Sequence, residues 1–464
     1  MAPTSAALPA EFLRRTEAIM GQERFARFLD AFHEEPPVSI RLNTRKLKNV
    51  EIPSSMVPWC ADGFYLSQRP SFTFDPLFHA GCYYVQEAAS QFIAHCTQYI
   101  CQQSQPHPQP RREGREGGES LWSESLPRRG EVLAQRCSAS VPLGRAGGGQ
   151  DLGFALDLCA APGGKSTALR SVLPDDCLLV SNEPVRKRAQ ILSENMQKWG
   201  HPNCLVTNNY PQNFVRSGLT GVFDLILCDV PCSGEGMFRK DPAAIGEWSP
   251  QNVERCWQLQ RQIVGDIWPC LRPSGIMVYS TCTFNTKENE ENVKWILENY
   301  DAEIIAVPTL PDWGICGSLL EGFDGPVYRF IPGLTRSEGL FVAMLKKKGS
   351  NEDRGGTKKA KAVTTALARL NKMESSSCAE ALSSTFDPSQ HTVVELDYDT
   401  AIAYLRREAI VLPPDTPRGI VVVSFKGHPL GIAKNIGSRA NNLYPREWAI
   451  KSTHLSSFDH LTIY

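Results

Sequence analysis

The chain contains 464 residues, which is enough for about three domains of ordinary size. Hydrophobic residues make up 42% of the chain and charged residues 21%, close to the composition of an ordinary soluble globular protein. The 49 Lys and Arg and the 50 Asp and Glu give a formal net charge of −1, which excludes a uniformly basic nucleic-acid binder of the histone type but leaves room for a local basic patch.

The first 101 residues are predicted to form an α+β domain. Apolar side chains recur at helical spacing over 10–32, and Pro36 and Pro37 end this helix. Residues 38–43 alternate in polarity as a strand does, and a second helix is expected over 85–100.

Residues 102–150 differ in composition from the rest of the chain. Of these 49 residues, 25 are Gly, Pro, Ser or Gln, and none is Lys. Such a segment cannot bury enough apolar surface to offset its ordering entropy, so it is predicted to be disordered. A disordered insertion and a mispredicted coding segment would both have this composition.

Strands and helices alternate within 151–348, the pattern of an α/β domain with a doubly wound parallel sheet. Short apolar runs predict strands at 155–159, 178–182, 205–207, 224–228 and 276–279. Longer periodic stretches between them predict helices at 165–172, 186–199 and 252–268.

The remainder of the chain is predicted to be a basic flexible linker, 349–390, and a small C-terminal domain, 391–464. Residues 346–372 carry nine Lys or Arg against two acidic residues. The C-terminal domain is expected to contain a helix near 400–407 and strands at 420–425 and 432–434.

A glycine-containing loop follows the first strand of the α/β domain. Gly163 and Gly164 allow backbone to approach a ligand closely, and the next helix presents its N–H groups there. The sequence GKS at 164–166 looks like the end of a phosphate loop, but that motif needs a glycine where this chain has Cys159, so an NTPase is disfavoured. Glu183 follows the second strand and can accept hydrogen bonds from ribose hydroxyls. The loop and Glu183 together predict a nucleoside cofactor.

Two cysteines follow two further strands. Cys232 lies in DVPCSG at 229–234, and Cys282 lies in STCT at 280–283. Because the carboxyl ends of parallel strands share one edge of the sheet, both thiols are expected beside the cofactor cleft. Most other cysteines lie in apolar runs and are interpreted as small core residues. No metal site is predicted, because no Cys-x2-Cys pair lies outside these loops and histidines are few.

The 15 cysteines are odd in number and too sparse for a disulfide scaffold. Residues 1–10 do not have the pattern of a signal peptide, and no segment approaches the roughly 18 apolar residues of a membrane span. We therefore expect a cytoplasmic protein, not associated with a membrane, whose reduced thiols can act as nucleophiles.

A nucleophilic thiol beside a methyl donor fits methylation at carbon 5 of a pyrimidine. This carbon is a poor nucleophile, but addition of a thiolate to carbon 6 moves electron density onto it, so that it can attack a sulfonium methyl group. Loss of the C5 proton and elimination of the thiol then regenerate the enzyme. Asp229 is placed to act as an acid near N3 or the exocyclic amine, and Val-Pro-Cys lacks the aromatic residue that amino-group methylation would require.

The loops that carry this chemistry closely resemble the signature loops of the Nol/Nop/Sun family of RNA cytosine-5 methyltransferases. The similar segments are 157–165, 229–236 and 279–283. VSIRLNTRK at 38–46 and QEAAS at 86–90 also resemble the N-terminal segments of this family.

The C-terminal domain resembles the bacterial RsmF type, which acts on small-subunit ribosomal RNA, in Arg418-Gly419-Ile420 and in NIGSRANNLY at 435–444. The likeness covers nearly the whole chain except 102–150 and 349–390, and several long motifs in the right order make it specific.

The resemblance implies a Rossmann-like class I methyltransferase domain, between an N-terminal α+β domain and a C-terminal PUA-like domain, with S-adenosylmethionine as cofactor. Cys282 would be the nucleophile that adds to carbon 6, and Cys232 would help to release the product. Asp229 would contact the target base and help to position the cofactor. The cofactor-binding residues would be Glu183, Cys159, Ala160, Ala161, Pro162, Gly163, Gly164 and Lys165, and Lys165 would also lie near the reacting centre.

One position departs from the family pattern. After the third strand the family usually presents an Asp to the adenine, whereas this chain has TNNY at 207–210. We expect Asn209 to contact the cofactor in its place and Tyr210 to be able to stack there, with cofactor affinity altered.

RNA is the expected partner, specifically 16S ribosomal RNA or the assembled small subunit, bound by a monomer. Phe238, Arg239 and Lys240 offer a stacking ring and two cations, although a solvated helix start would have the same sequence. Arg41 and Asn43 are either RNA contacts or part of a surface strand. Residues 401–464 hold eight Lys or Arg against four acidic residues, which suits RNA binding.

Three other functions remain open. A non-catalytic RNA-binding assembly factor could keep this fold, but it would not need both thiols. A tRNA cytosine-5 methyltransferase would share the chemistry. A DNA cytosine methyltransferase places its nucleophile in the Pro-Cys loop, so Cys282 argues against it.

Overall fold

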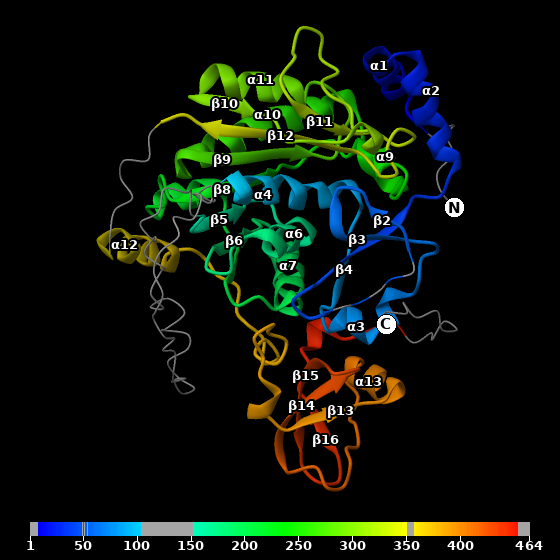
Figure 1. The fold of residues 1–464 in the computed structure, drawn as a ribbon, viewed down its shortest axis with the longest axis vertical. Helices are drawn as coiled ribbons and strands as arrows, with labels where there is room; N and C mark the ends of the chain where they lie inside the picture. Colours follow the sequence, from blue (N-terminus) through cyan, green and yellow to red (C-terminus); the bar gives the residue numbers. More distant parts are fainter. Residues whose placement is uncertain are drawn as a thin grey trace, which may run out of the picture.

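A computed structural model of the chain describes residues 8–103 except 49, 51 and 53, residues 152–349 and residues 357–452. The insertion predicted at 102–150 lies outside the described residues from position 104 onward. Three sheets organise the described chain: an N-terminal sheet, a large central sheet and a C-terminal sheet (Figure 1).

The N-terminal domain is α+β, as predicted. The stretch expected to be a single helix forms two, α1 (Ala10–Met20) and α2 (Gln22–Asp30), because Gly21 has a φ of 75°, which interrupts the helix. The sheet has the order β2-β3-β1-β4 and is antiparallel throughout. Its strands are β1 (Val38–Leu42), β2 (Met56–Val57), β3 (Cys60–Leu66) and β4 (Tyr83–Val85). Helix α3 (Pro76–His79) lies between β3 and β4, and helix α4 (Phe92–Gln103) follows β4.

The central sheet has the order β10-β12-β9-β8-β5-β6-β7, with β11 paired to β12. Five neighbouring strands are parallel: β5 (Phe154–Asp157), β6 (Leu178–Asn182), β7 (Cys204–Thr207), β8 (Phe223–Asp229) and β9 (Leu271–Thr281). The expectation of a wholly parallel sheet is corrected at the other edge, where β10 (Ala302–Ile305), β11 (Val327–Phe330) and β12 (Leu340–Lys347) pair antiparallel. These last strands are joined by loops and need no crossover helix to reverse direction.

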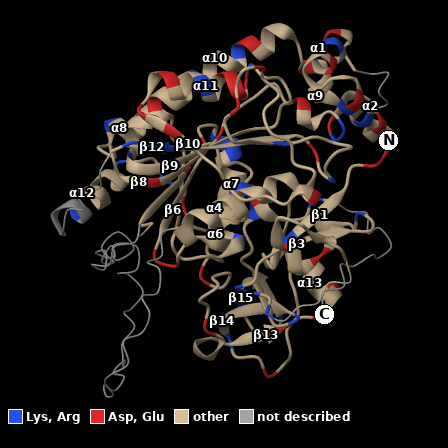
Figure 2. Ribbon diagram, turned by 45° about the horizontal axis from the view of Figure 1, so that its top comes forward, with Lys and Arg blue, Asp and Glu red and all other residues tan. Residues whose placement is uncertain are grey.

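Helices link the parallel strands and pack on the central sheet (Figure 1). They are α6 (Gly164–Val172), α7 (Arg186–Trp199), α8 (Pro211–Arg216), α9 (Pro242–Glu247), α10 (Pro250–Ile267) and α11 (Glu290–Asn299). Charged residues of both signs occur along α10 and α11 (Figure 2), while the central strands are almost entirely buried. The sheet is therefore covered on its faces, as a doubly wound fold requires.

The C-terminal sheet has the order β13-β14-β15-β16 and lies at one end of the molecule, next to α3 (Figure 1). It consists of β13 (Val393–Glu395), β14 (Gly419–Phe425), β15 (His428–Asn435) and β16 (Ala440–Asn442), with helix α13 (Tyr398–Leu405) beside it. One apolar cluster joins this domain to the N-terminal domain, since Ile40 and Leu77 pack in the same cluster as Tyr404 and Val421.

The segment expected to be a flexible linker is folded over the part that the structure describes. It contains helix α12 (Thr357–Ala368), and Leu370, Cys378 and Leu382 are buried. Asn371 and Met373 make backbone hydrogen bonds to the edge strand β7, at Asn208 and Val206. The segment thus runs along the edge of the central sheet because that edge has unpaired backbone groups.

Within the described ranges, no helix is both long enough and apolar enough to cross a membrane.

Candidate active site

The loops singled out in the sequence meet where the strand order of the central sheet reverses. Strand β5 lies between β6 and β8, so the chain proceeds from β5 toward β7 on one side and from β8 toward β9 on the other. In an open α/β sheet, a ligand site forms at the carboxyl ends of the strands on either side of such a reversal. The loop after β5, the loop after β8 and the loop after β9 all begin there.

The glycine-containing loop is held close to its neighbours. Gly163 has a φ of 116°, a conformation that disfavours other residues, and begins helix α6. A Cβ at Gly164 would lie only 3.3 Å from the ring of Tyr84. Two loop carbonyls are held from α7, since Arg188 donates to Ala161 O at 3.2 Å and Asn195 donates to Pro162 O at 2.8 Å. Ala160 is buried, and burial raises the pKa of the Cys159 thiol well above its ordinary value, so that this thiol stays neutral.

Two buried carboxyl groups have oxygen atoms that no hydrogen bond satisfies. Glu183 is 1% exposed; its Oε1 accepts from the Val185 N–H at 3.0 Å, while Oε2 accepts no hydrogen bond and lies 3.3 Å from Arg188 Nη2. Asp157 Oδ2 accepts from Ser166 at 2.7 Å, and its Oδ1 has no hydrogen-bond partner. Because an unsatisfied buried acceptor is costly, Glu183 Oε2 fits a ligand that brings its own donors, such as the hydroxyls of a ribose.

Asn209 is buried at the same edge, but its side chain is occupied by the chain itself. Its amide nitrogen donates to Asn371 O at 3.0 Å, and its amide oxygen accepts from Asn371 N at 3.1 Å. Its contact with the cofactor stays a prediction. Tyr210 is 66% exposed and is open to stacking.

A lysine and an aspartate bridge the glycine loop and the loop after β8. Lys165 Nζ lies 2.9 Å from Asp229 Oδ2, and Ser280 donates to Asp229 Oδ1 at 2.7 Å. Burial lowers the pKa of Lys165, but the charges of Asp229 and Cys282 outweigh burial, so that this pKa lies above its ordinary value. The ammonium group therefore stays charged next to the cysteines.

The two cysteines are brought together from separate strand ends. Cys232 Sγ lies 3.1 Å from Cys282 Sγ, and the Cys282 N–H donates to Cys232 Sγ at 3.3 Å. Both side chains are partly exposed, in contrast to the buried Cys228, Cys256 and Cys270. The sequence placed both thiols on one edge, and the structure brings them into direct contact.

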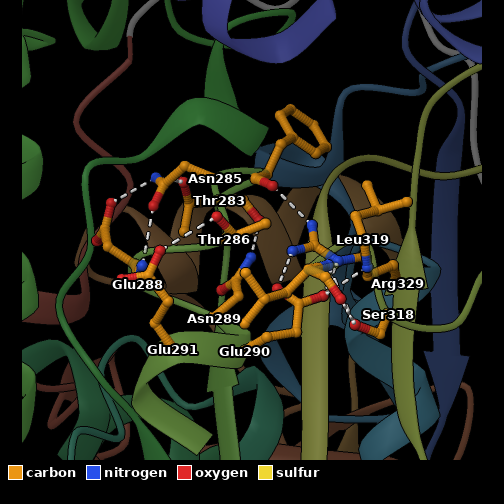
Figure 3. Close-up of polar contacts among 12 residues, drawn as sticks. Thr283, Asn285, Thr286, Glu288, Asn289, Glu290, Glu291, Ser318, Leu319 and Arg329 are labelled. Carbon is orange, nitrogen blue, oxygen red and sulfur yellow. Dashed lines mark hydrogen bonds and ion pairs between the residues drawn. The ribbon is translucent and has the colours of Figure 1, made fainter. Parts of the chain in front are cut away.

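A polar network behind the thiols was not predicted. It is built from Glu235, Thr283, Asn285 and Glu288, and Asn285 Nδ2 donates to both carboxylates. Figure 3 shows Asn285 next to Glu288. Beside it, Glu290 forms a buried ion pair with Arg329, and Arg329 also donates to Phe284 O at 2.6 Å. The sequence feature that could have indicated this network is a carboxylate close after each cysteine: Glu235 is three residues after Cys232, and Glu288 is six residues after Cys282.

Two of the groups considered for RNA contact are buried. Phe238 is 0% exposed and packs against Phe12 with ring centroids 5.0 Å apart, and Arg239 pairs with Glu338 at 3.1 Å. Stacking of a base on Phe238 is therefore wrong, because helix α1 covers this ring. Lys240 is exposed.

Arg41 and Asn43 are not surface residues either. Arg41 is fully buried and donates to Gln86, Thr167 and Ser171, and Asn43 donates to two backbone carbonyls, Gly81 O and Trp199 O. These side chains fasten the N-terminal sheet to helices α6 and α7. Among the described residues, no group of three or more His, Cys, Asp or Glu could hold a metal ion.

Three family models match the chain in the order of its domains. Residues 149–346 match 16S rRNA methyltransferase RsmB/F. Residues 8–88 match the N-terminal domain of 16S rRNA methyltransferase RsmF, and residues 391–450 match the methyltransferase RsmF PUA domain.

Curated relatives have similar lengths and sequences. The chain is 27% identical to ribosomal RNA small subunit methyltransferase F of Serratia proteamaculans, over 96% of this chain and 97% of that protein. It is 30% identical to the protein of the same name from Pectobacterium carotovorum, over 75% of this chain and 64% of the relative.

Solved structures agree in fold. NSun6 from Pyrococcus horikoshii with SFG aligns with a TM-score of 0.53 at 18% identity, covering 74% of this chain and 99% of that one. A methyltransferase homolog protein from Pyrococcus horikoshii aligns with a TM-score of 0.51 at 22% identity, covering 74% of this chain and 100% of that one. The central domain therefore has the Rossmann-like methyltransferase fold.

Proposed function

Because the chain belongs to the RsmF-type family of 16S rRNA methyltransferases, we propose that it methylates carbon 5 of a cytosine in small-subunit ribosomal RNA through a covalent bond between Cys282 and carbon 6. The observation that carries this proposal is the pair of thiols 3.1 Å apart, with Cys282 close enough to Lys165 for their charges to interact and Lys165 paired with Asp229 at 2.9 Å. Methylation of an amino group or a hydroxyl needs no thiol, whereas carbon 5 of a pyrimidine must first be activated.

S-adenosylmethionine is the cofactor of this family, and when bound it supplies an electrophilic methyl group on a sulfonium. The residues placed to hold it are Glu183, through its unsatisfied Oε2, and the loop from Cys159 to Lys165, through backbone N–H groups at the start of helix α6. Buried Asp157 fixes the loop through Ser166. The residues present fit a ligand with a ribose and a positive charge, since the carboxylates of Glu183 and Asp229 lie at the same edge.

Each group near the thiols has a distinct part in the proposed reaction. The Cys282 thiolate forms a bond to carbon 6, and the displaced electron pair moves to carbon 5, which receives the methyl group. Asp229, held by Lys165 and Ser280, contacts the target base at N3 or its exocyclic amine. In the release step carbon 5 loses its proton to solvent, the double bond re-forms and the sulfur of Cys282 departs with its electron pair. Cys232 donates its S–H hydrogen bond to the departing sulfur.

The RNA partner is proposed from the family and from the C-terminal domain, which matches a PUA domain. Lys240 and the basic side chains of residues 401–464 are available for phosphate contacts. We propose that the protein acts as a monomer in the cytoplasm, where reducing conditions keep both thiols free.

The proposal is tested by incubating the protein with methyl-labelled S-adenosylmethionine and either small ribosomal subunits, free 16S RNA or tRNA, and then mapping the modified base. We expect 5-methylcytosine at a defined position of the ribosomal RNA. Label on another base, or no label in any of the three substrates, would contradict the proposal. Label in tRNA alone would mean that tRNA, and not ribosomal RNA, is the substrate. A non-catalytic assembly factor would bind subunits without transferring label.

A further inference from the structure

Each of the two loops that carry the thiols has a buried carboxylate that accepts hydrogen bonds from the backbone of the other loop. Glu235, from the loop after β8, accepts hydrogen bonds from the backbone N–H groups of Phe284 at 2.7 Å and Asn285 at 3.0 Å, in the loop after β9. In the opposite direction, Glu288 accepts from the backbone N–H of Ser233 at 3.0 Å. Each loop thus binds the backbone of the other. These hydrogen bonds hold the two loops, and therefore the two sulfur atoms, at a fixed separation.

The donors to both carboxylates are neutral. Asn285 Nδ2 lies 3.0 Å from Glu235 Oε1 and 2.8 Å from Glu288 Oε1, and Gln260 donates to Glu288 Oε2 at 2.7 Å. Glu288 is 0% exposed. Burial and the charge of Glu235 raise the pKa of Glu288 to about 7.

The two sulfur atoms have different electrostatic surroundings. The hydrogen bond with Cys282, burial, the charge of Cys282 and the charge of Glu288 raise the pKa of Cys232 well above its ordinary value. Cys282 lies instead close enough to Lys165 to raise the pKa of that lysine. The titratable and charged groups that act on the two thiols, besides the thiols themselves, are Lys165, Tyr279, Cys256 and Glu288, and Lys165 is itself paired with Asp229 at 2.9 Å.

We infer that Glu288 is a positioning residue that holds Cys232 in the thiol form and thereby makes Cys282 the sulfur that ionises. Its carboxylate binds the Ser233 N–H, directly after Cys232, so that negative charge lies behind one sulfur while the Lys165 ammonium lies near the other. Coulomb interactions in a buried site are strong enough to distinguish two thiols 3.1 Å apart. The inference rests on the proposed function, because it explains why Cys282 rather than Cys232 would be the nucleophile.

The test measures the reactivity of each thiol directly. The full-length protein, without RNA or cofactor, is treated with iodoacetamide between pH 6 and pH 9, and alkylation of Cys232 and Cys282 is followed separately by peptide mass spectrometry. A thiolate reacts and a thiol does not, so the rate reports ionisation. In the unmodified protein we expect Cys282 to react faster than Cys232 at pH 7.5.

The variant Glu288→Gln removes the charge with little change in shape. We expect it to increase the alkylation rate of Cys232 at pH 7.5 by about tenfold, as a shift of about one pKa unit would, and to change the rate of Cys282 much less. Glu288→Asp, which keeps a carboxylate, should leave Cys232 slow. Glu291→Gln is the matched control, because this side chain lies on the same segment and accepts only a long hydrogen bond from Thr286, at 3.4 Å.

Two results would overturn the inference. One is a Cys232 rate that is the same in Glu288→Gln as in the unmodified protein; the other is a Cys232 that already reacts faster than Cys282 in the unmodified protein. The second measurement needs no variant, so the inference can be overturned even if Glu288→Gln does not fold. Neither involves methyl transfer, so a failed labelling experiment with an intact reactivity difference would count against the proposed function alone.

Discussion

At the scale of single residues, the buried carboxyl groups around the loops differ in what they can bind. Asp157 is fully buried and shares one oxygen with Ser166, while its other oxygen has no hydrogen-bond partner. Asp229 has Lys165 on one oxygen and Ser280 on the other. The negative charge of Asp229 is therefore stabilised by an ion pair with Lys165. Asp157 has no such ion pair, so burial disfavours its charged form.

The two cysteines are expected to fail in different ways when removed. Cys282→Ala should lower methylation below about one ten-thousandth of the normal rate, because nothing then adds to carbon 6. Cys232→Ala should instead accumulate a covalent RNA–protein adduct, because formation is intact and release is slowed. Denaturing gel electrophoresis with labelled RNA separates the two outcomes, and an adduct with Cys282→Ala instead would reverse the assignment of the thiols.

Asp157 predicts a pH-dependent stability difference. Burial raises the pKa of Asp157 in the folded protein to about 7, above its value in the unfolded chain. The contribution of this protonated group to stability is therefore fully present at low pH and is lost as pH rises through about 7. Asp157→Asn cannot ionise. Relative to this variant, the unmodified protein should therefore lose on the order of a few kcal/mol of unfolding free energy between about pH 4 and pH 8.

Urea unfolding of both proteins at each pH measures this difference. Taking the difference removes the contributions of other groups, including His79, whose pKa burial lowers to about 3. The exposed Asp176→Asn is the control and should change the unfolding free energy by less than about 0.5 kcal/mol. A difference between the unmodified protein and Asp157→Asn that does not vary with pH would contradict the prediction.

At the scale of elements, contacts from outside the central domain hold the loops in place. Helices α1 and α2 pack Phe12 against Phe238 and Phe28 against Phe284, with ring centroids 5.0 Å and 5.1 Å apart. These aromatic rings directly follow the cysteine loops. On the other side of the site, residues 371–373 pair with the end of β7.

The pairing at β7 predicts a local change in hydrogen exchange. In Asn209→Ala the Asn371 N–H loses its acceptor, so its exchange should become at least about fivefold faster, since a hydrogen bond contributes about 1 kcal/mol. The Met373 N–H, which donates to Val206 O, is the internal comparison and should change less. Equal exchange of Asn371 in both proteins would show that the Asn209 side chain does not hold this segment. Asn203→Ala is the matched control, because this half-buried side chain also donates to a backbone carbonyl, Asp175 O, but not to residues 371–373.

At the scale of the whole molecule, the C-terminal domain shares its core with the N-terminal domain. Tyr398 donates to Phe74 O at 3.0 Å, and Trp448 and Tyr444 belong to the apolar cluster that contains Ile40. The near-zero net charge of the whole chain is an average over unlike parts, because residues 401–464 hold eight basic residues against four acidic ones. The basic domain is thus fixed to the body of the enzyme and can present RNA in a defined direction.

This shared core predicts an asymmetric effect of removing residues 391–464. Strand β1 should lose hydrogen-exchange protection, because Ile40 and Leu42 lose part of their apolar cover, while β5 and β8 in the central sheet should keep theirs. Hydrogen exchange followed by mass spectrometry compares these strands within one sample. Unchanged protection of β1 would mean that the two domains are energetically independent.

Much of the central domain could be predicted from its sequence, since β5, β6, β8 and helices α6, α7 and α10 lie close to the ranges expected. Patterns of apolar residues are local, and a strand buried on both faces is apolar along its length. The antiparallel edge was missed because strand direction depends on pairing between distant segments. The folded residues 357–390 were missed because their sequence is basic up to Lys372 and rich in Ser after it, and their stability comes from the sheet edge on which they pack.

The sequence by itself determined which chemical groups the protein brings to its site: a glycine loop, an acidic residue after β6 and two cysteines after two strands. These features lie within short motifs, so they can be recognised without a structure. Only the tertiary structure decided that the thiols lie 3.1 Å apart, that Phe238 and Arg41 are buried and that Glu235 and Glu288 link the two loops. Burial and contact distance depend on what packs against a residue from far along the chain, and no local pattern carries that information.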